Sequence, residues 1–160
     1  MILKTYRKAF SMITAIVIIV LMSTVAILVL DMSGKVIKET TAQFQNEQAT
    51  LYANSYTEYA ILAVTGNDRK KACLQTINTT MGTPTNGNGY RIRVQIAYIG
   101  TLAEVGKCPT TRILSDSVTT KKSPLTIIVD AYVDYKPIDA EGGSNNAPWI
   151  TYHRRTIQKI

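Results

Sequence analysis

The chain has 160 residues, a length that allows one long helix and one small domain. Its 18 Lys and Arg residues outnumber 11 Asp and Glu residues and give a formal net charge of +7, but no stripe of basic residues with interleaved aromatic residues indicates nucleic-acid binding. The sequence has a single His and lacks a Walker lysine, an H-x-x-x-H pair and a paired-cysteine motif, so we expect a structural protein and not an enzyme.

The first thirty residues combine a basic leader with an uncharged hydrophobic segment. Lys4, Arg7 and Lys8 precede Phe10, and no charged residue occurs from Phe10 to Leu30. As a helix, these 21 residues would span roughly 31 Å, the hydrocarbon thickness of a bilayer. The segment is too long for the core of an ordinary secretory signal, and no A-x-A cleavage site follows it. We therefore expect a transmembrane helix at residues 10–30.

The charges that flank this segment predict its orientation. The leader has three basic residues and no acidic one, whereas the charges of residues 31–39 are balanced. The positive-inside rule then places the N-terminus in the cytoplasm and the residues beyond about 31 outside the membrane. In a bacterium with two membranes, the protein would cross the inner membrane once and expose its C-terminal head to the periplasm.

The junction Lys8-Ala9-Phe10-Ser11-Met12-Ile13 resembles the processing site of type IV prepilins and type II secretion pseudopilins. The resemblance implies that a prepilin peptidase cleaves between Ala9 and Phe10, that residues 1–9 are a leader, and that Phe10 becomes a methylated N-terminus. Thr14 departs from the family pattern, because most members carry a Glu at this position that neutralises the terminal ammonium of a neighbouring subunit. In the family, a missing Glu marks a minority of subunits, notably a minor pseudopilin at the filament tip.

The resemblance also implies a function in filament assembly. The chain would be a minor pilin or pseudopilin, at the tip or as an initiator, in the short filament of a type II secretion, type IV pilus or DNA-uptake machine. Its partners would be other pilins, bound through the N-terminal helix, the prepilin peptidase and an inner-membrane assembly platform; nucleic acid would be a partner only in a DNA-uptake machine. The alternative is a bitopic inner-membrane sensor or interaction protein whose periplasmic head binds a ligand or partner.

Residues 31–65 continue the helical pattern without a proline and are expected to form the periplasmic half of the helix. Ile37, Phe44 and Leu51 recur at intervals of seven and form a narrow apolar stripe suited to packing against other helices. From Leu51 onward the apolar positions are denser and partly aromatic, as expected where a helix packs on a sheet. Gly66 is a typical stop signal.

Residues 66–160 are expected to form a globular α+β head. Alternation of apolar and polar residues predicts strands at 90–98, 125–135 and 149–157, and a short edge strand at 112–118. Residues 68–77 are expected to be a short helix or irregular, and residues 79–89, rich in Gly, Pro, Asn and Thr, are expected to be a loop. The predicted fold is a long N-terminal helix whose second half packs on a small antiparallel sheet, which is also the pilin fold.

The two cysteines, Cys73 and Cys108, both lie beyond the membrane segment, on the oxidising side. A bridge between them would close a loop of about 35 residues and constrain the unfolded chain by about 4 kcal/mol. Two buried thiols are the alternative; metal binding is disfavoured because the spacing is wrong and the single His, His153, is distant. We expect a disulfide.

No cofactor is expected, although four oxygen-bearing residues deserve consideration as calcium ligands. Asp134, Asp139, Glu141 and Asn145 fall within twelve residues, and oxygen ligands in a flexible loop suit Ca²⁺. Their spacing matches no established ligand pattern, so the sequence favours a solvated loop over a calcium site.

Overall fold

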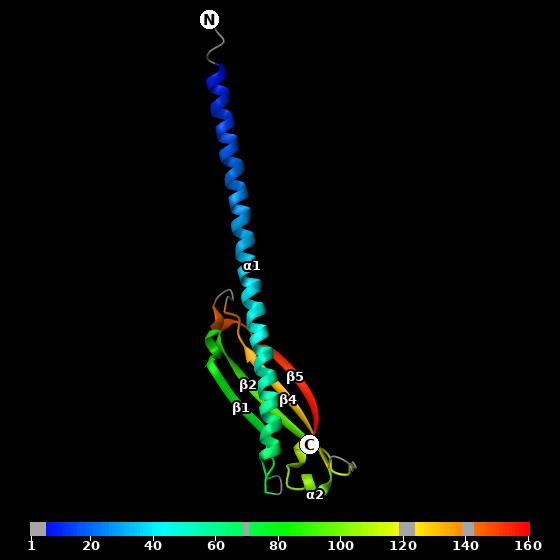
Figure 1. The fold of residues 1–160 in the computed structure, drawn as a ribbon. Helices are drawn as coiled ribbons and strands as arrows, with labels where there is room; N and C mark the ends of the chain where they lie inside the picture. Colours follow the sequence, from blue (N-terminus) through cyan, green and yellow to red (C-terminus); the bar gives the residue numbers. More distant parts are fainter. Residues whose placement is uncertain (1–5, 69–70, 119–123, 139–142) are drawn as a thin grey trace. The chain divides into compact units, whose positions relative to one another are not determined.

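The structure is a computed structural model that describes residues 6–68, 71–118, 124–138 and 143–160, with only the backbone of residues 6–11. Contacts divide the chain into two units, Met1–Thr41 and Ala42–Ile160. Helix α1 (Tyr6–Gly66) contributes to both (Figure 1). It ends at Gly66, as the sequence predicts, and it is long and apolar enough to cross a membrane.

Five strands follow in the second unit: β1 (Thr76–Thr83), β2 (Asn88–Gly100), β3 (Ile113–Ser115), β4 (Leu125–Tyr135) and β5 (Ile150–Lys159). The order is β1-β2-β4-β5, with every neighbour antiparallel, and β3 pairs with β2 in parallel. A one-turn helix, α2 (Leu102–Val105), and 3₁₀ turns at Pro84–Asn86, Thr110–Arg112 and Ser144–Asn146 lie between strands. The antiparallel sheet expected from the sequence is therefore present, with β3 as a parallel exception.

The α1 segment of the second unit covers one face of this sheet, lying across β2 and β4 (Figure 1). Alternate side chains of these two strands are buried, with relative exposures of 0–1%: Ile92, Val94, Ile96, Tyr98, Leu125, Ile127, Val129, Ala131 and Val133. The fully buried helix residues that join this core are small: Ala49, Ala53, Ala60 and Val64. Small side chains allow the helix backbone to approach the large strand side chains closely. The molecule thus has the predicted α+β fold.

Residues 79–89 form most of a β-hairpin, so the prediction of a loop was wrong. β1 pairs with β2 along its whole length, and the Pro84–Asn86 turn connects the two strands. The glycines at 82 and 87 have φ values of 65° and 76°, which favour glycine over other residues. Thr is common in strands, but a polar edge strand flanked by turn residues has nearly the composition of a loop.

The other strand predictions agree with the structure except at their ends. The predicted strand at residues 125–135 has the bounds of β4, and those at 90–98 and 149–157 correspond to β2 and β5. The predicted edge strand at 112–118 shortens to β3. Within residues 68–77, the described part before β1 is irregular and contains no helix.

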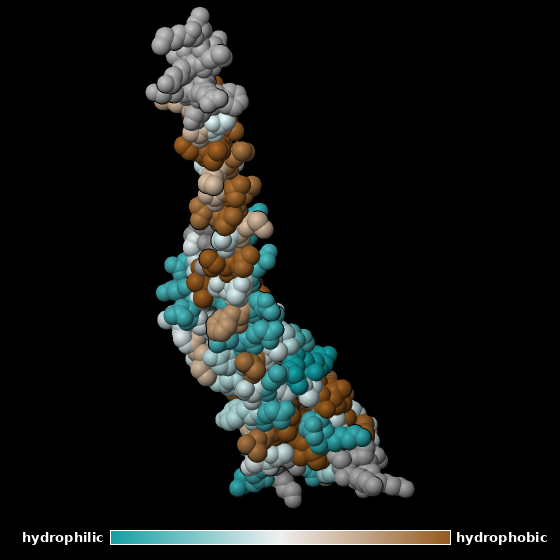
Figure 2. Space-filling model, turned by 45° about the horizontal axis from the view of Figure 1, so that its top comes forward, coloured by the Kyte–Doolittle hydropathy of each residue, from teal (hydrophilic) through white to brown (hydrophobic). Residues whose placement is uncertain are grey.

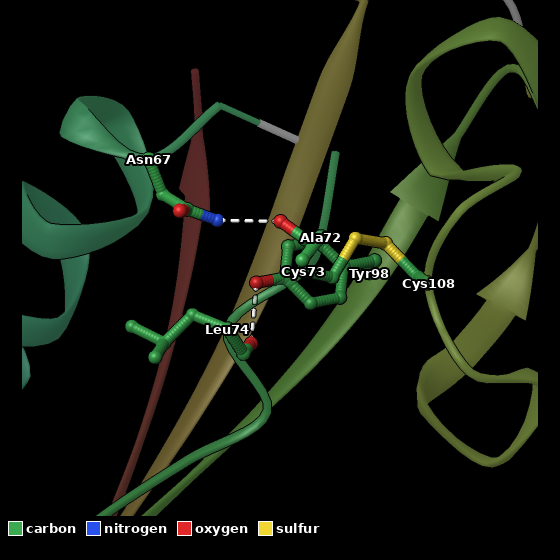
Figure 3. Close-up of a disulfide and its surroundings, with 6 residues drawn as sticks. All are labelled: Asn67, Ala72, Cys73, Leu74, Tyr98 and Cys108. Atoms are coloured by element: carbon green, nitrogen blue, oxygen red, sulfur yellow. Dashed lines mark hydrogen bonds between the residues drawn. A yellow bond between two sulfur atoms is a disulfide. The ribbon is translucent and has the colours of Figure 1, made fainter. Parts of the chain in front are cut away.

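Cys73 and Cys108 form the expected disulfide, with Cα atoms 5.0 Å apart (Figure 3). It joins the segment between α1 and β1 to the loop after α2. The Tyr98 hydroxyl donates a hydrogen bond of 2.5 Å to the Leu74 carbonyl, and the Asn67 side chain donates one of 2.6 Å to a backbone carbonyl of the same segment. These bonds hold the connection where the chain turns from the helix back to the sheet.

Candidate functional site

Residues 12–30 of α1 present apolar side chains on every side of the helix. All of them are exposed, and the large hydrophobic residues have relative exposures of 51–74%. Brown side chains cover much of this part of the helix in Figure 2. A helix that is hydrophobic all round needs an apolar environment, either a bilayer or other helices.

Ser23 and Thr24, two polar residues within this apolar segment, form hydrogen bonds with the backbone of the helix itself. Ser23 Oγ donates to the Ile19 carbonyl at 2.7 Å, and Thr24 Oγ1 donates to the Leu21 carbonyl at 2.8 Å. An unsatisfied polar group in hydrocarbon costs several kcal/mol, so these bonds make the segment compatible with lipid. Thr14 lies in the same exposed stretch of the helix.

The predicted cleavage residues, Ala9 and Phe10, lie within α1, where the backbone is helical. The structure does not describe their side chains. Their role as a peptidase site therefore stays a prediction from the sequence.

The side of α1 opposite the sheet carries an apolar stripe in the second unit. Phe44, Leu51 and Leu62 have relative exposures of 59%, 64% and 71%. Spacings of seven and eleven residues place these three side chains along one line of a helix. Scattered apolar residues on a surface are normal, but a line of them at helical spacing suits contact with another helix.

Strand pairing gathers cationic and aromatic side chains on the sheet face opposite α1. The guanidinium of Arg93 lies 5.6 Å from the centre of the Tyr132 ring, and this ring stacks on His153 at 4.4 Å. Arg91 lies 4.5 Å from the centre of the Trp149 ring. At such distances cations are attracted to the faces of aromatic rings. We call these five residues, together with Arg155 of β5, the cation–aromatic array.

The array could not be predicted from the local sequence, because its members come from β2, β4 and β5 and, for Trp149, from the residue just before β5. Arg91 and Arg93 are two residues apart, as are His153 and Arg155, so each pair shares one face of its strand. This period of two was the available signal. Only the register, with Arg93 opposite Tyr132 and Tyr132 opposite His153, brings the pairs together.

Two aspartates of β4 neutralise much of the positive charge of the array. Asp134 is 1% exposed and accepts hydrogen bonds from Arg91 Nε and Arg93 Nε, both at 3.0 Å, and from Thr151 Oγ1 at 2.7 Å. Burial alone would raise the pKa of Asp134, but the hydrogen bonds from Thr151, Arg93 and Arg91 outweigh burial and hold this pKa below its ordinary value.

Asp130 is held in a similar way at the other end of the array. Arg155 Nε donates to it at 2.7 Å, and His153 Nε2 lies 2.8 Å from the same oxygen. Burial again acts to raise the pKa of Asp130, and the hydrogen bonds from Arg155 and His153 lower it below its ordinary value.

These contacts make Asp134 unfavourable as a calcium ligand, in agreement with the preference of the sequence for a loop without calcium. The carboxylate of Asp134 faces the guanidinium groups of Arg91 and Arg93. These groups repel a cation, and they already form ion pairs with the carboxylate oxygens that would have to bind calcium. The backbone carbonyl of Asn145 accepts a 2.5 Å hydrogen bond from Lys136 Nζ, a third positive charge in this region. Asp139 and Glu141 lie outside the described residues. Within the described ranges, no group of three or more His, Cys, Asp or Glu residues is placed to hold a metal.

No protein-family model, curated protein or solved structure matches the chain. The fold and these surfaces define a class of protein: an α+β domain built on the second half of a helix whose first half is apolar enough to cross a membrane.

Proposed function

We propose that the chain is a structural subunit of a bacterial filament, a minor pilin or pseudopilin. The observation that carries this proposal is the continuity of α1, which runs without a break from the Ala9-Phe10 junction through the apolar segment to the residues that pack on the sheet. Such a helix anchors the head in a bilayer. Once it leaves the bilayer, other apolar helices must cover it, because exposing so much apolar surface to water is unfavourable.

Before assembly, the protein would reside in the inner membrane with its N-terminus in the cytoplasm and its head in the periplasm. The basic leader supports this orientation. A disulfide between Cys73 and Cys108 suits an oxidising compartment such as the periplasm. The prepilin peptidase would act on the leader, and an inner-membrane platform would draw the mature subunit into the filament of a secretion, pilus or DNA-uptake machine.

Contacts with neighbouring subunits would use the helix. The apolar segment at residues 12–30 would pack in the filament core, and the stripe of Phe44, Leu51 and Leu62 would extend this lateral contact along the head. Both surfaces are exposed and apolar, as a helix–helix interface requires.

Thr14 supports a position at the tip or at initiation. Its hydroxyl can form hydrogen bonds but cannot supply the negative charge that would neutralise a neighbour's terminal ammonium. An uncompensated buried charge costs several kcal/mol, too much to repeat in every subunit of a shaft. At the end of a filament, one subunit can lack the carboxylate, because no neighbour requires it there.

The mass of the mature N-terminus tests the proposal. Protein from cells with an active prepilin peptidase should begin at a methylated Phe10, and protein from peptidase-deficient cells should keep residues 1–9. Ala9→Phe should remain uncut because the peptidase must accommodate a small side chain, whereas Ala9→Gly should be processed normally. Recovery of a chain that begins at Met1 from peptidase-positive cells would reject the pilin assignment and favour a bitopic sensor or interaction protein.

A further inference from the structure

β1 is an edge strand, and within the described residues no strand pairs with its outer side. The Ile96 amide donates a 2.9 Å hydrogen bond to the carbonyl of Gln75, which lies directly opposite in the register of β1 and β2. Hydrogen-bonded and non-hydrogen-bonded pairs alternate along an antiparallel ladder. Thr76, Asn78 and Thr80 therefore direct their backbone N–H and C=O groups away from β2, and all three residues are exposed.

This edge lacks the features that usually prevent pairing with another chain. The eight residues of β1 include no Lys, Arg, Asp, Glu or Pro. At the opposite edge of the sheet, β5 carries Arg154, Arg155 and Lys159. Charged side chains on an edge strand disfavour edge-to-edge pairing, so β5 is protected and β1 is not.

An open groove of about 390 Å³ lies beside β1, on the face of the sheet that α1 covers. Ser55, Tyr56 and Tyr59 of α1 and Ile77 and Thr79 of β1 line it. None of these side chains is charged, so a charged group entering the groove would lose water without gaining an ionic partner. A strand added beside β1 would place every second side chain on this face.

We propose that β1 binds an extended segment of another polypeptide as an additional strand. The segment is uncharged over about six residues and has an apolar side chain at alternate positions, because the outer backbone groups of β1 supply the hydrogen bonds and the groove receives the alternate side chains. A second copy of this chain fits poorly. Two β1 strands that pair about a two-fold axis run antiparallel, and their α1 helices then also run antiparallel. Two chains that are anchored in one membrane by α1 cannot adopt this arrangement. The exclusion of a second copy rests on the proposed function, whereas the rest of the inference does not.

Selection of peptides on the full-length protein in detergent micelles tests the inference. We expect a phage-displayed library of random peptides to yield uncharged sequences with alternating apolar residues, whose binding is then measured by fluorescence anisotropy. Asn78→Pro or Thr80→Pro should weaken binding about tenfold or more, because each removes one outward N–H and leaves the β1–β2 ladder intact. Tyr59→Ser, in the groove, should also weaken it.

The matched control lies on the opposite edge. The Ile160 amide donates to the Leu125 carbonyl at 2.9 Å, so by the same alternation Ile157 of β5 has an outward N–H. Ile157→Pro should bind the peptide like the unmodified chain. Asn78→Lys keeps the backbone donor and adds a charge to the edge, and it should also weaken binding. Because this variant contains no new proline, weaker binding would show that the effect of the proline variants does not come from unfolding.

Hydrogen exchange provides a direct readout, since the amides of Thr76, Asn78 and Thr80 should become protected when peptide binds. Peptides that bind the edge-proline variants as tightly as the unmodified chain would overturn the inference, as would a library that yields no binder. A dimer of the chain that is lost in Asn78→Pro would also overturn it, because the occupant would then be a second copy. The Ala9→Phe chain should still bind peptide, which separates this test from that of leader processing.

Discussion

Asp134 illustrates, at the scale of single residues, how the sheet tolerates a buried charge. A buried carboxylate is destabilising unless several groups compensate for it. Here Arg91 and Arg93 of β2 and Thr151 of β5 all donate to a carboxylate that belongs to β4, the strand between them. One side chain therefore links three strands on the face of the sheet opposite α1.

We expect the free energy of unfolding to decrease as the pH falls below about 4. The folded-state pKa values of Asp134 and Asp130 lie below their ordinary value, so the unfolded chain takes up protons first. The stability that these carboxylates contribute is complete above the unfolded pKa of about 3.9 and is lost as the pH falls through the folded pKa. Urea titrations at a series of pH values, followed by circular dichroism, measure this dependence.

Substitution of Asp134 tests its share of the effect. Asp134→Asn should be less stable at neutral pH and lose less stability on acidification, because one of the two carboxylates no longer titrates. Asp116→Asn removes an exposed carboxylate and is the matched control. An acid dependence that is the same in Asp134→Asn as in the unmodified chain would show that this carboxylate is not responsible.

Thr14 leads to a prediction about abundance. Under the proposed function, the protein should be present in few copies per filament, and its deletion should prevent filament initiation. Thr14→Glu should enter the shaft and raise its ratio to the companion pilins, whereas Thr14→Gln, of similar shape but uncharged, should not. Quantitative mass spectrometry of sheared filaments measures the ratio. If the unmodified protein proves to be the most abundant subunit of the shaft, the charge argument is wrong.

At the scale of secondary-structure elements, the contact between α1 and the sheet depends on small helix residues. Ala49, Ala53 and Ala60 have no exposed surface and face large side chains of β2 and β4. A longer side chain at these positions would push the helix away from the sheet or force strained rotamers. The interface therefore restricts the volume of the helix side chains at these positions more strongly than their hydrophobicity.

The change in the free energy of unfolding on replacing one of these alanines with a larger residue measures how strongly the interface restricts side-chain volume. Ala53→Leu is expected to lower the free energy of unfolding by about 1–3 kcal/mol because the added atoms have no space. Ala42→Leu places the same side chain at an exposed position of the same helix and should change the stability by less than about 0.5 kcal/mol. Urea denaturation of the two variants compares them. Equal stabilities would indicate that the interface can repack.

The disulfide connects two irregular segments that contribute little to the sheet ladder. Cys73→Ser is expected to lower the free energy of unfolding by about 2–4 kcal/mol, since the bridge restricts a loop of 35 residues in the unfolded chain. Denaturation with and without reductant measures this, and reductant should affect only the unmodified protein. Thiol labelling of the denatured, unreduced protein should detect no free cysteine. Two free thiols in periplasmic material would contradict the bridge.

At the scale of the whole molecule, the two units differ in where their stability arises. The hydrophobic core uses residues from Ala49 onward, all within Ala42–Ile160. The side chains of residues 12–30 are all exposed and contribute no packing within the described chain. The second unit should therefore fold without the first.

A fragment that begins at Ala42 is expected to be soluble without detergent and to unfold cooperatively. Its urea midpoint should equal that of the head in the full-length protein, measured in detergent, because the core is complete in both. The full-length protein should require detergent, since its apolar helix would otherwise associate. A fragment that is unfolded or aggregated would show that residues before 42 support the head.

The sequence by itself was sufficient to predict the apolar helix, its end at Gly66, the strand at residues 125–135 and the α+β class. These features depend on hydrophobic periodicity and on stop signals between neighbours along the chain. The pairing of Cys73 with Cys108 was also predictable, since there are only two cysteines.

Only the tertiary structure decided that the Thr-rich segment before residue 84 is a strand, because a polar edge strand takes its conformation from hydrogen bonds to β2. It also decided the contacts of Asp134, for which the local sequence offered a calcium site only as the alternative to a solvated loop. The arginines that neutralise Asp134 are 41 and 43 residues away in sequence, and the register of β2 against β4 brings them within 3.0 Å. Electrostatic and stacking interactions depend on distance in space, and strand register, which the local pattern does not specify, sets those distances.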